Sequence, residues 1–148
     1  MLLNTRYFGQ IEIDPKNIID FPEGIPGFEN VKKFVLLHHE DQDSPFQWLQ
    51  GVDNPHLAFV VIDPRLCKED YVVDVEDAEV AILDIRDTGK VLIYSIVVVP
   101  EDLSKMTANL KAPVLINTEN NKGKQVILNN EDYPIKYYIL QQLQKTGG

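Results

Sequence analysis

Cysteine is almost absent from this 148-residue sequence, because Cys67 is the only one. A single cysteine cannot form an intramolecular disulfide, which is typical of proteins that remain in a reducing compartment. Long apolar runs are also missing: the longest, Val91–Val99, contains Ser95 and is far shorter than the roughly 20 residues of a membrane-spanning helix. The N-terminal MLLNTRYFGQ lacks the apolar core of a signal peptide. These absences predict a cytoplasmic protein that does not interact with membranes.

Basic residues are scarce, since 14 Lys and Arg stand against 23 Asp and Glu and the formal net charge is −9. Proteins that bind nucleic acids rely on Lys and Arg contacts with phosphate groups, so the composition argues against direct nucleic-acid binding. Anionic membrane surfaces are disfavoured for the same reason. Basic proteins are the partners that this charge favours.

Sequence motifs that carry chemistry are missing as well. Gly24 and Gly27 lie in EGIPGF with Pro26 between them, which indicates a rigid turn and not a phosphate-binding loop. Cys67 has no catalytic signature around it, and we interpret it as a half-buried structural thiol.

The pair His38-His39 is the one candidate for a metal site. Neighbouring residues on a strand point to opposite faces, so both imidazoles cannot easily bind one ion. The acidic residues that follow, Glu40, Asp41 and Asp43, lack the ligand spacing and the glycine of a calcium-binding loop. The sequence therefore predicts no catalytic, cofactor-binding or metal-binding residues and a protein that is not an enzyme.

Turn-forming residues interrupt the sequence at short intervals, and the runs between them are rich in Val, Ile, Phe and Tyr. This rhythm is typical of mainly β proteins, so we expect a single domain over residues 1–148 with a β-barrel-like or sandwich fold. The apolar runs Leu57–Ile62 and Val91–Val99 are expected to be central strands. Turns at Asp87–Gly89 and Asn120–Lys124 predict two hairpins. The predicted strands are Gly9–Ile13, Phe34–His38, Gln47–Gln50, Leu57–Ile62, Val72–Val75, Val80–Arg86, Val91–Val99, Val114–Asn117 and Gln125–Leu128.

Helix signals are few. Short turns of helix are expected at Asp63–Cys67 and near Pro100–Leu103. Near the C-terminus, a cap at Asp132 and a stripe of Ile135, Ile139 and Leu143 predict a helix that plugs a barrel end or covers a sheet edge. The last four residues, 145–148, are expected to be disordered.

Acidic residues are concentrated in one part of the chain, where Arg86 is the only base between residues 69 and 87. They form either a solvated surface that keeps the protein soluble or a docking surface for a basic partner. The acids of this stretch are Glu69, Asp70, Asp74, Glu76, Asp77, Glu79, Asp84 and Asp87, and the first six are our candidate binding residues.

Protein binding also needs apolar anchors. Phe28, on the rigid EGIPGF turn, is one candidate, and the PFQWLQ stretch offers Phe46, Trp48 and Leu49. The alternative is that all four are core residues that close the barrel. For Trp48 we favour a place in the core. For Phe28 we favour neither the core nor the role of a binding anchor.

Four blocks of the sequence resemble the flagellar assembly factor family, FliW. They are GQIEI at Gly9–Ile13, IDFPEGIPGFEN at Ile19–Asn30, PFQWLQGVDNPHLAFVVIDP at Pro45–Pro64, and TANLKAPVLIN at Thr107–Asn117 followed by GKQVIL at Gly123–Leu128. Each block alone is a weak signal. Four blocks in the same order, in a chain of this length, are specific.

The resemblance implies a monomeric, barrel-like binding protein of bacterial flagellum biogenesis. Members of the family bind the C-terminal region of flagellin in the cytoplasm. They also bind CsrA, a basic RNA-binding dimer that represses flagellin translation, and relieve that repression once flagellin has been exported. The alternatives are a small-molecule-binding β-barrel and a general secretion chaperone without a regulatory role.

Overall fold

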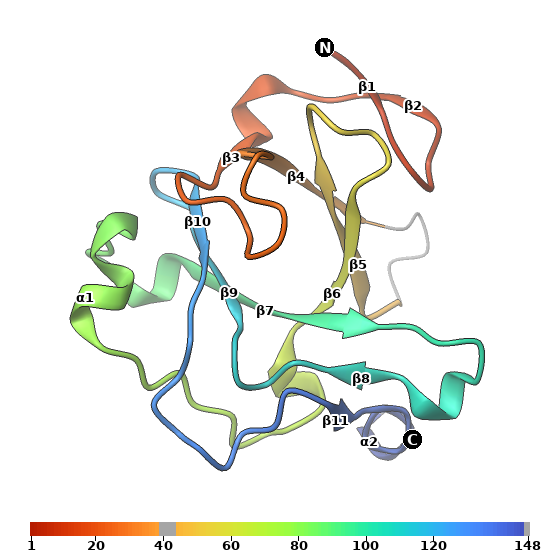
Figure 1. The fold of residues 1–148 in the computed structure, drawn as a ribbon, viewed down its shortest axis with the longest axis vertical. Helices are drawn as coiled ribbons and strands as arrows, with labels where there is room; N and C mark the ends of the chain where they lie inside the picture. Colours follow the sequence, from red (N-terminus) through yellow and green to blue (C-terminus); the bar gives the residue numbers. More distant parts are fainter. Residues whose placement is uncertain (39–43, 147–148) are drawn as a thin grey trace.

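One long strand organises the sheet of this protein, whose computed structural model describes residues 1–38 and 44–146. Strand β7 (Val91–Val98) is eight residues long and forms hydrogen-bonded ladders with three other strands (Figure 1). The remaining strands are β1 (Leu2–Asn4), β2 (Gln10–Glu12), β3 (Ile19–Asp20), β4 (Lys33–His38), β5 (Phe46–Gly51), β6 (Ala58–Ile62), β8 (Thr107–Ala108), β9 (Val114–Asn117), β10 (Lys122–Gln125) and β11 (Tyr137–Tyr138).

The helices are short. They are the α-helices α1 (Asp77–Val80) and α2 (Leu140–Thr146) and the 3-10 helices η1 (Pro15–Asn17), η2 (Pro64–Leu66), η3 (Ala81–Leu83), η4 (Thr88–Lys90) and η5 (Leu103–Lys105). Asp14, Asp63, Asp87 and Asp102 each precede a 3-10 helix and accept a hydrogen bond from a backbone N–H two residues on. Such local bonds favour turns over strands.

The main sheet closes on itself. Its strands follow the order β7-β6-β5-β4-β3-β10-β9, and β9 returns to pair with β7. The first half of β7 lies against β9 with Tyr94 opposite Val114, whereas the second half lies against β8 with Val97 opposite Ala108. Strand β11 extends this second branch. The structure therefore confirms a mainly β, barrel-like fold with few and short helices, and it shows that the barrel is closed.

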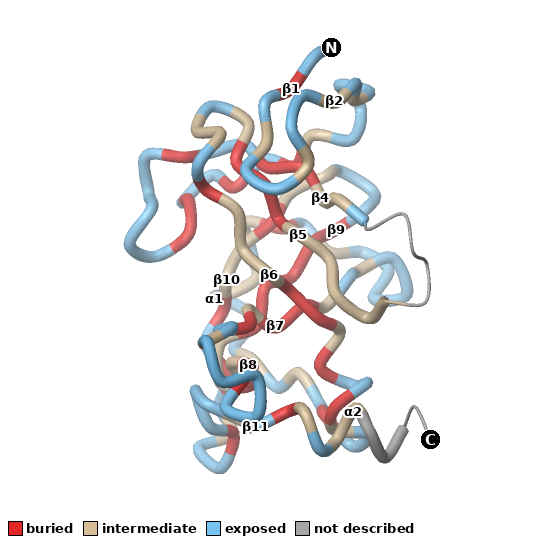
Figure 2. Tube along the Cα trace, turned by 90° about the vertical axis from the view of Figure 1, so that its right-hand side faces the viewer, coloured by how far each residue is buried: buried red, intermediate tan, exposed pale blue. Residues whose placement is uncertain are grey.

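Large apolar side chains fill the space that the ring of strands encloses. Phe21 and Phe34 contribute fully buried rings whose centroids are 5.0 Å apart. Leu49, Val61, Val114 and Ile116 belong to the same buried cluster. Figure 2 shows the most buried parts of the chain along the central strands, and exposed chain around them.

Two further clusters lie outside the barrel. One contains Tyr71, Leu83 and Leu110, and the Tyr71 hydroxyl donates to the Leu110 carbonyl at 2.6 Å. Burial raises the pKa of Tyr71, so the hydroxyl remains a donor at neutral pH. The other contains Cys67 and Ile139 and packs under the N-terminal part of helix α2.

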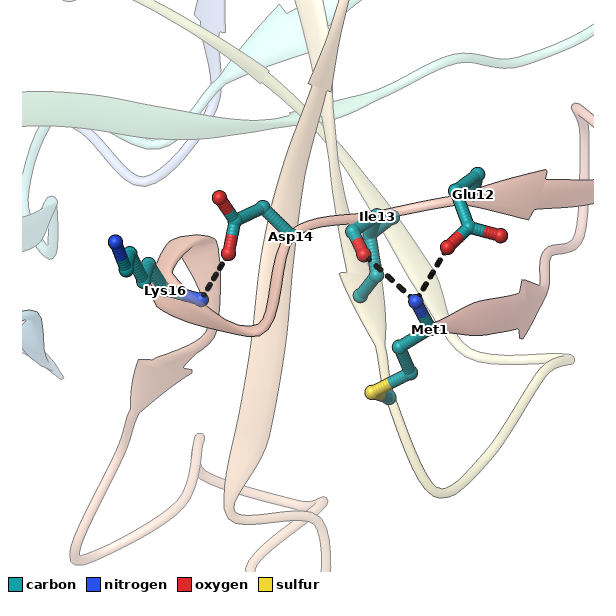
Figure 3. Close-up of polar contacts among 5 residues, drawn as sticks. All are labelled: Met1, Glu12, Ile13, Asp14 and Lys16. Atoms are coloured by element: carbon teal, nitrogen blue, oxygen red, sulfur yellow. Dashed lines mark hydrogen bonds and ion pairs between the residues drawn. The ribbon is translucent and has the colours of Figure 1, made fainter.

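The N-terminal hairpin of β1 and β2 is tied together at its open end. The Met1 ammonium contacts the Glu12 carboxylate and donates to the Ile13 carbonyl at 3.2 Å (Figure 3). In the same view, the Asp14 side chain accepts from the Lys16 amide at 2.9 Å and starts η1. The hairpin is held against β5 because the Arg6 amide donates to the buried Gln50 side chain at 3.0 Å.

Most of the predicted strands are confirmed. The segments at Gly9–Ile13, Phe34–His38, Gln47–Gln50 and Val114–Asn117 coincide with β2, β4, β5 and β9, within a residue or two at each end. Leu57–Ile62 and Val91–Val99 coincide with β6 and β7, which have neighbours on both sides. The hairpin around Asn120–Lys124 is also confirmed, but its second strand, β10, ends at Gln125, where the predicted strand begins.

The strands predicted at Val72–Val75 and Val80–Arg86 are wrong. Residues 71–76 are extended without belonging to a ladder, and residues 77–83 form α1 and η3. Side chains from the β9–β10 hairpin stabilise the helical turns, because Asn117 and Asn120 both donate to the Leu83 carbonyl at 2.9 Å. The hairpin predicted at Asp87–Gly89 is therefore absent, and η4 leads directly into β7.

The C-terminal helix exists but begins later than predicted. Strand β11 precedes it, with Tyr138 exposed and Ile139 buried, so the chain follows a strand-like alternation before the helix starts at Leu140. Ile135, expected on the helix stripe, is 64% exposed. Helix α2 includes residues 145 and 146 of the expected tail, and residues 147 and 148 lie outside the described part of the chain. The turn predicted near Pro100–Leu103 is displaced to η5.

A glycine on β10 makes room for the ring of Phe21. A Cβ atom at Gly123 would lie 2.5 Å from the Phe21 ring, which is closer than real Cβ contacts. We expect Gly123→Ala to lower the free energy of unfolding by about 3 kcal/mol, because a packed core tolerates added volume poorly. Gly89→Ala is the control, since its Cβ would meet only the Asp87 carboxylate at 3.2 Å. Chemical denaturation of both variants measures the difference, and equal midpoints would contradict this packing account.

Candidate protein-interaction surface

The residues that the structure describes contain no cluster of candidate metal ligands. Within residues 1–38 and 44–146, no group of three or more His, Cys, Asp or Glu could hold a metal ion. His38 ends β4 and is exposed, whereas His39, Glu40, Asp41 and Asp43 lie outside the described part of the chain. No helix among the described residues is long and apolar enough to cross a membrane.

The single thiol is buried. Cys67 is 4% exposed and packs in the cluster that contains Ile62 and Met106. Burial, with a smaller contribution from the negative charge of Asp63, raises its pKa to about 11. The thiol therefore stays protonated at neutral pH, consistent with the structural role that the sequence suggested.

An apolar groove lies on the outer side of β5 and β6. We call it the Trp48 groove, and its volume is about 640 Å³. Trp48 lies in its floor between Leu37 of β4 and Val60 of β6, which are its cross-strand neighbours. The groove is lined by Tyr7, Phe8, Phe46, Trp48, Val60, Val99, Leu103 and Met106.

Two loops form the walls of the Trp48 groove. One wall is the tip of the N-terminal hairpin, where Phe8 meets Trp48 edge to face with the ring centroids 5.2 Å apart. The other wall is the β7–β8 connection, where Val99 and Leu103 are 48% and 55% exposed. Exposed apolar side chains that gather in one hollow mark interaction sites on proteins. This groove is accordingly our main candidate for a protein-binding surface.

A second apolar hollow, the Phe59 groove, has a volume of about 240 Å³. The rim is formed in part by Val98, which precedes Val99 of the Trp48 groove, so the end of β7 contributes to both hollows. Consecutive strand residues point to opposite sides, which explains this division. The groove is lined by Ile25, Pro26, Phe59, Ile96, Val98, Thr107, Asn109, Gln125, Ile135 and Lys136.

The EGIPGF turn lies beside the Phe59 groove and presents Phe28. The Phe28 ring is 44% exposed and meets Phe59 edge to face, with the centroids 5.3 Å apart. Gly24 has a φ of +68°, and a Cβ at this position would lie 2.6 Å from the Glu29 backbone, so only glycine fits the turn. The Glu29 carboxylate accepts from the Gly27 amide at 3.0 Å, which lowers the pKa of Glu29.

The acidic stretch forms a separate surface around α1 and the extended chain before it. Six candidate residues were predicted there, and all are exposed except Glu79, which is half-buried. Asp70 pairs with Lys68 at 3.0 Å, and this contact lowers the pKa of Asp70. Among the residues that the structure describes, Glu69, Glu76 and Asp77 make no ion pair.

Lys124 of β10 joins the acidic stretch to the EGIPGF turn. Its ammonium is 3.3 Å from the Glu23 carboxylate and 3.7 Å from the Glu79 carboxylate, and it donates to the Glu79 carbonyl at 2.7 Å. The side chain is only 15% exposed. A partly buried cation with two carboxylate neighbours holds these elements in fixed positions.

The structure separates the residues that the sequence grouped as candidates. Phe46 lies in the Trp48 groove, Phe28 beside the Phe59 groove, and the acids elsewhere. Leu49, a further candidate anchor, is fully buried in the barrel, because it alternates with the outward-facing Trp48. Tyr7, Phe8, Val99 and Leu103 of the Trp48 groove were not among the residues predicted from the sequence. Their only signal was an apolar residue next to a turn, which core residues share.

Comparisons of the sequence and of the structure with known proteins all match the same protein family. A family model described as FliW protein matches residues 2–139. A flagellar assembly factor FliW of Thermoanaerobacter pseudethanolicus is 50% identical over 146 residues, covering 99% of this chain and 97% of the relative. One of Ruminiclostridium cellulolyticum is 47% identical over 145 residues, covering 98% of each chain. A crystal structure of the flagellar assembly factor FliW, 40% identical, superposes with a TM-score of 0.86 over 94% of this chain and 96% of the other.

Proposed function

This chain belongs to the FliW family of flagellar assembly factors, and from that premise we propose that it binds flagellin in the cytoplasm before export. Once free of flagellin, it binds CsrA and relieves the repression of flagellin translation. The observation that carries this proposal is the family match over residues 2–139, which includes all four blocks identified in the sequence. The role is one of protein binding and not of catalysis.

The apolar grooves support the protein-binding role. Interfaces gain affinity mainly from a few apolar and aromatic residues in well-packed hollows. The Trp48 groove supplies such residues on walls that are already formed, because the Gln50 contact positions the hairpin and Asp102 caps η5. A preformed groove loses little conformational entropy on binding.

The acidic stretch supports the proposal for a basic partner. RNA binding requires positive potential at the phosphate groups, and a docked acidic protein lowers that potential without covering the RNA site. Glu76 and Asp77 are exposed carboxylates free of ion pairs within the described residues, so they are available to basic side chains. We therefore propose that this stretch contributes to the antagonism of CsrA.

The alternative functions differ in what they require. A β-barrel that carries a small molecule inside it needs an open interior, but Phe21, Phe34 and Leu49 fill the barrel of the described structure. A general secretion chaperone would bind many proteins through the same grooves. Affinity capture separates it from an assembly factor, because the assembly factor would retain flagellin as the dominant client.

The proposed function is tested by adding the protein to CsrA bound to flagellin leader RNA, with and without flagellin. We expect the RNA to be released when the protein is added alone and to be retained when flagellin is added first. RNA release is measured by fluorescence anisotropy of labelled RNA. RNA that stays bound at every ratio would contradict the regulatory half of the proposal, while direct binding to purified flagellin tests the other half.

A charge in the Trp48 groove should weaken the binding of at least one partner. We expect Leu103→Asp to reduce affinity for flagellin or for CsrA at least tenfold, because the carboxylate must be desolvated in an apolar interface. Leu66→Asp is the control, since Leu66 is also an exposed leucine of a 3-10 helix, η2, outside the groove. Thermal unfolding checks that both variants fold. Unchanged affinity of Leu103→Asp for both proteins would exclude the groove as the interface.

Charge reversal in the acidic stretch should weaken CsrA binding in a salt-dependent way. We expect a Glu76→Lys, Asp77→Lys double variant to lose at least tenfold in affinity at low ionic strength and less when salt screens the charges. The matched control is Asp53→Lys, Glu119→Lys, which alters net charge by the same amount at two exposed acids elsewhere. Glu79 is left intact because its carboxylate contacts Lys124. Equal losses in both variants would mean that net charge, and not this surface, governs binding.

A further inference from the structure

Residues 71–76 form an extended segment that lies between η2 and α1 but belongs to no ladder. Its side chains alternate as in a strand. Tyr71, Val73 and Val75 pack into the cluster around Leu110, whereas Val72, Asp74 and Glu76 are exposed. In Figure 1 this segment follows the periphery of the molecule on its way to α1.

One edge of the segment is already occupied. The Val72 amide donates to the Tyr133 hydroxyl at 2.9 Å, and the Asp74 carbonyl accepts from the Asn129 amide at 2.8 Å. In an extended chain, successive residues direct their N–H and C=O groups to opposite edges. Residues 72 and 74 therefore face the chain that follows β10, and residues 73 and 75 face the other way.

The opposite edge is open. Throughout residues 1–38 and 44–146, no hydrogen-bond partner exists for the N–H and C=O groups of Val73 and Val75. Backbone groups without a protein partner must be hydrated, and such an edge is a template for another strand.

We propose that this open edge binds an extended segment of a partner protein that carries Lys or Arg, by addition of a strand. Backbone groups of the incoming segment pair with those of Val73 and Val75. Strand addition of this kind derives its affinity from main-chain hydrogen bonds and its specificity from alternate side chains.

The acidic side chains beside the open edge favour a basic partner strand. Asp74 and Glu76 project outward beside the open edge, and Glu69, Asp70 and Asp77 flank the segment. Opposite charges on neighbouring strands stabilise a sheet, whereas like charges directly opposite each other destabilise it. A basic strand is therefore favoured, and a second copy of this chain is disfavoured because it would bring its own carboxylates to the same edge.

The exposed face also predicts the pattern of the partner strand. Val72, which is 61% exposed, lies two residues before Asp74 and four before Glu76 on the same face. Cross-strand neighbours on one face form the contacting pairs. The incoming segment should thus place two basic side chains, two residues apart, opposite Asp74 and Glu76, and an apolar contact next to Val72.

This inference rests on the protein-binding role proposed above and specifies how the acidic stretch would recognise a basic partner. Its test uses a synthetic probe and neither flagellin nor CsrA, so the strand-addition mode and the regulatory role can fail separately. The probe is the capped octapeptide Thr-Lys-Thr-Lys-Thr-Val-Thr-Thr, whose two lysines and one valine lie on the same face when the peptide is extended. Its control is the same peptide with every backbone nitrogen methylated, which keeps the charge but cannot donate main-chain hydrogen bonds.

We expect the unmodified peptide to bind at least tenfold more tightly than the methylated one. Binding should slow amide hydrogen exchange at Val73 and Val75, while the Val72 amide, already bonded to Tyr133, serves as the internal reference. An Asp74→Asn, Glu76→Gln variant should bind the peptide at least tenfold more weakly, and the matched Asp53→Asn, Glu119→Gln variant within about twofold of the unmodified protein.

Two results would overturn the proposal. If the two peptides bind equally, attraction between charges accounts for binding and no strand is added. If the peptide binds but exchange at Val73 and Val75 is unchanged, the probe occupies another surface.

Discussion

Strand β7 is the constraint on which the rest of the structure depends, because it is shared by three ladders. It pairs with β6 along one edge and with β9 and then β8 along the other. A shift of one residue in this strand would exchange its inward and outward side chains in all three ladders at once. The register of β7 therefore sets both what fills the barrel and what reaches its surface.

The two apolar grooves follow from the place where β7 ends. Val97 is buried, and beyond it the chain leaves the barrel, so Val98 and Val99 reach the surface on opposite sides. The connection to β8 then crosses outside β5 and β6, where Leu103 and the hairpin residues Tyr7 and Phe8 complete the Trp48 groove. The apolar surface that supports protein binding is thus a consequence of how the barrel closes.

Side-chain hydrogen bonds hold the irregular half of the molecule in place. Asn117 of β9 is 1% exposed and donates to the Leu83 carbonyl, and Lys124 of β10 bonds the Glu79 carbonyl. These contacts satisfy backbone groups that a ladder would otherwise satisfy. As a result, the β9–β10 hairpin holds α1 and η3 of the acidic stretch in place.

The sequence by itself determined the family, the mainly β class, the excess of acidic charge and the positions of most strands. It could do so because turn residues and runs of Val, Ile and Phe act locally, and because the four blocks are specific in their order. It failed at Val72–Val75, whose backbone bonds to Tyr133 and Asn129 in the chain after β10, and at Val80–Arg86, where Asn117 and Asn120 of the β9–β10 hairpin bond the Leu83 carbonyl. Only the tertiary structure decided that Leu49 is core while its neighbour Trp48 lines a groove, since strand residues alternate between faces and burial depends on what lies across each face. The tertiary structure also decided that Phe28, Phe46 and the acids lie on different surfaces. The path of the closed barrel, and not distance along the chain, sets which side chains meet.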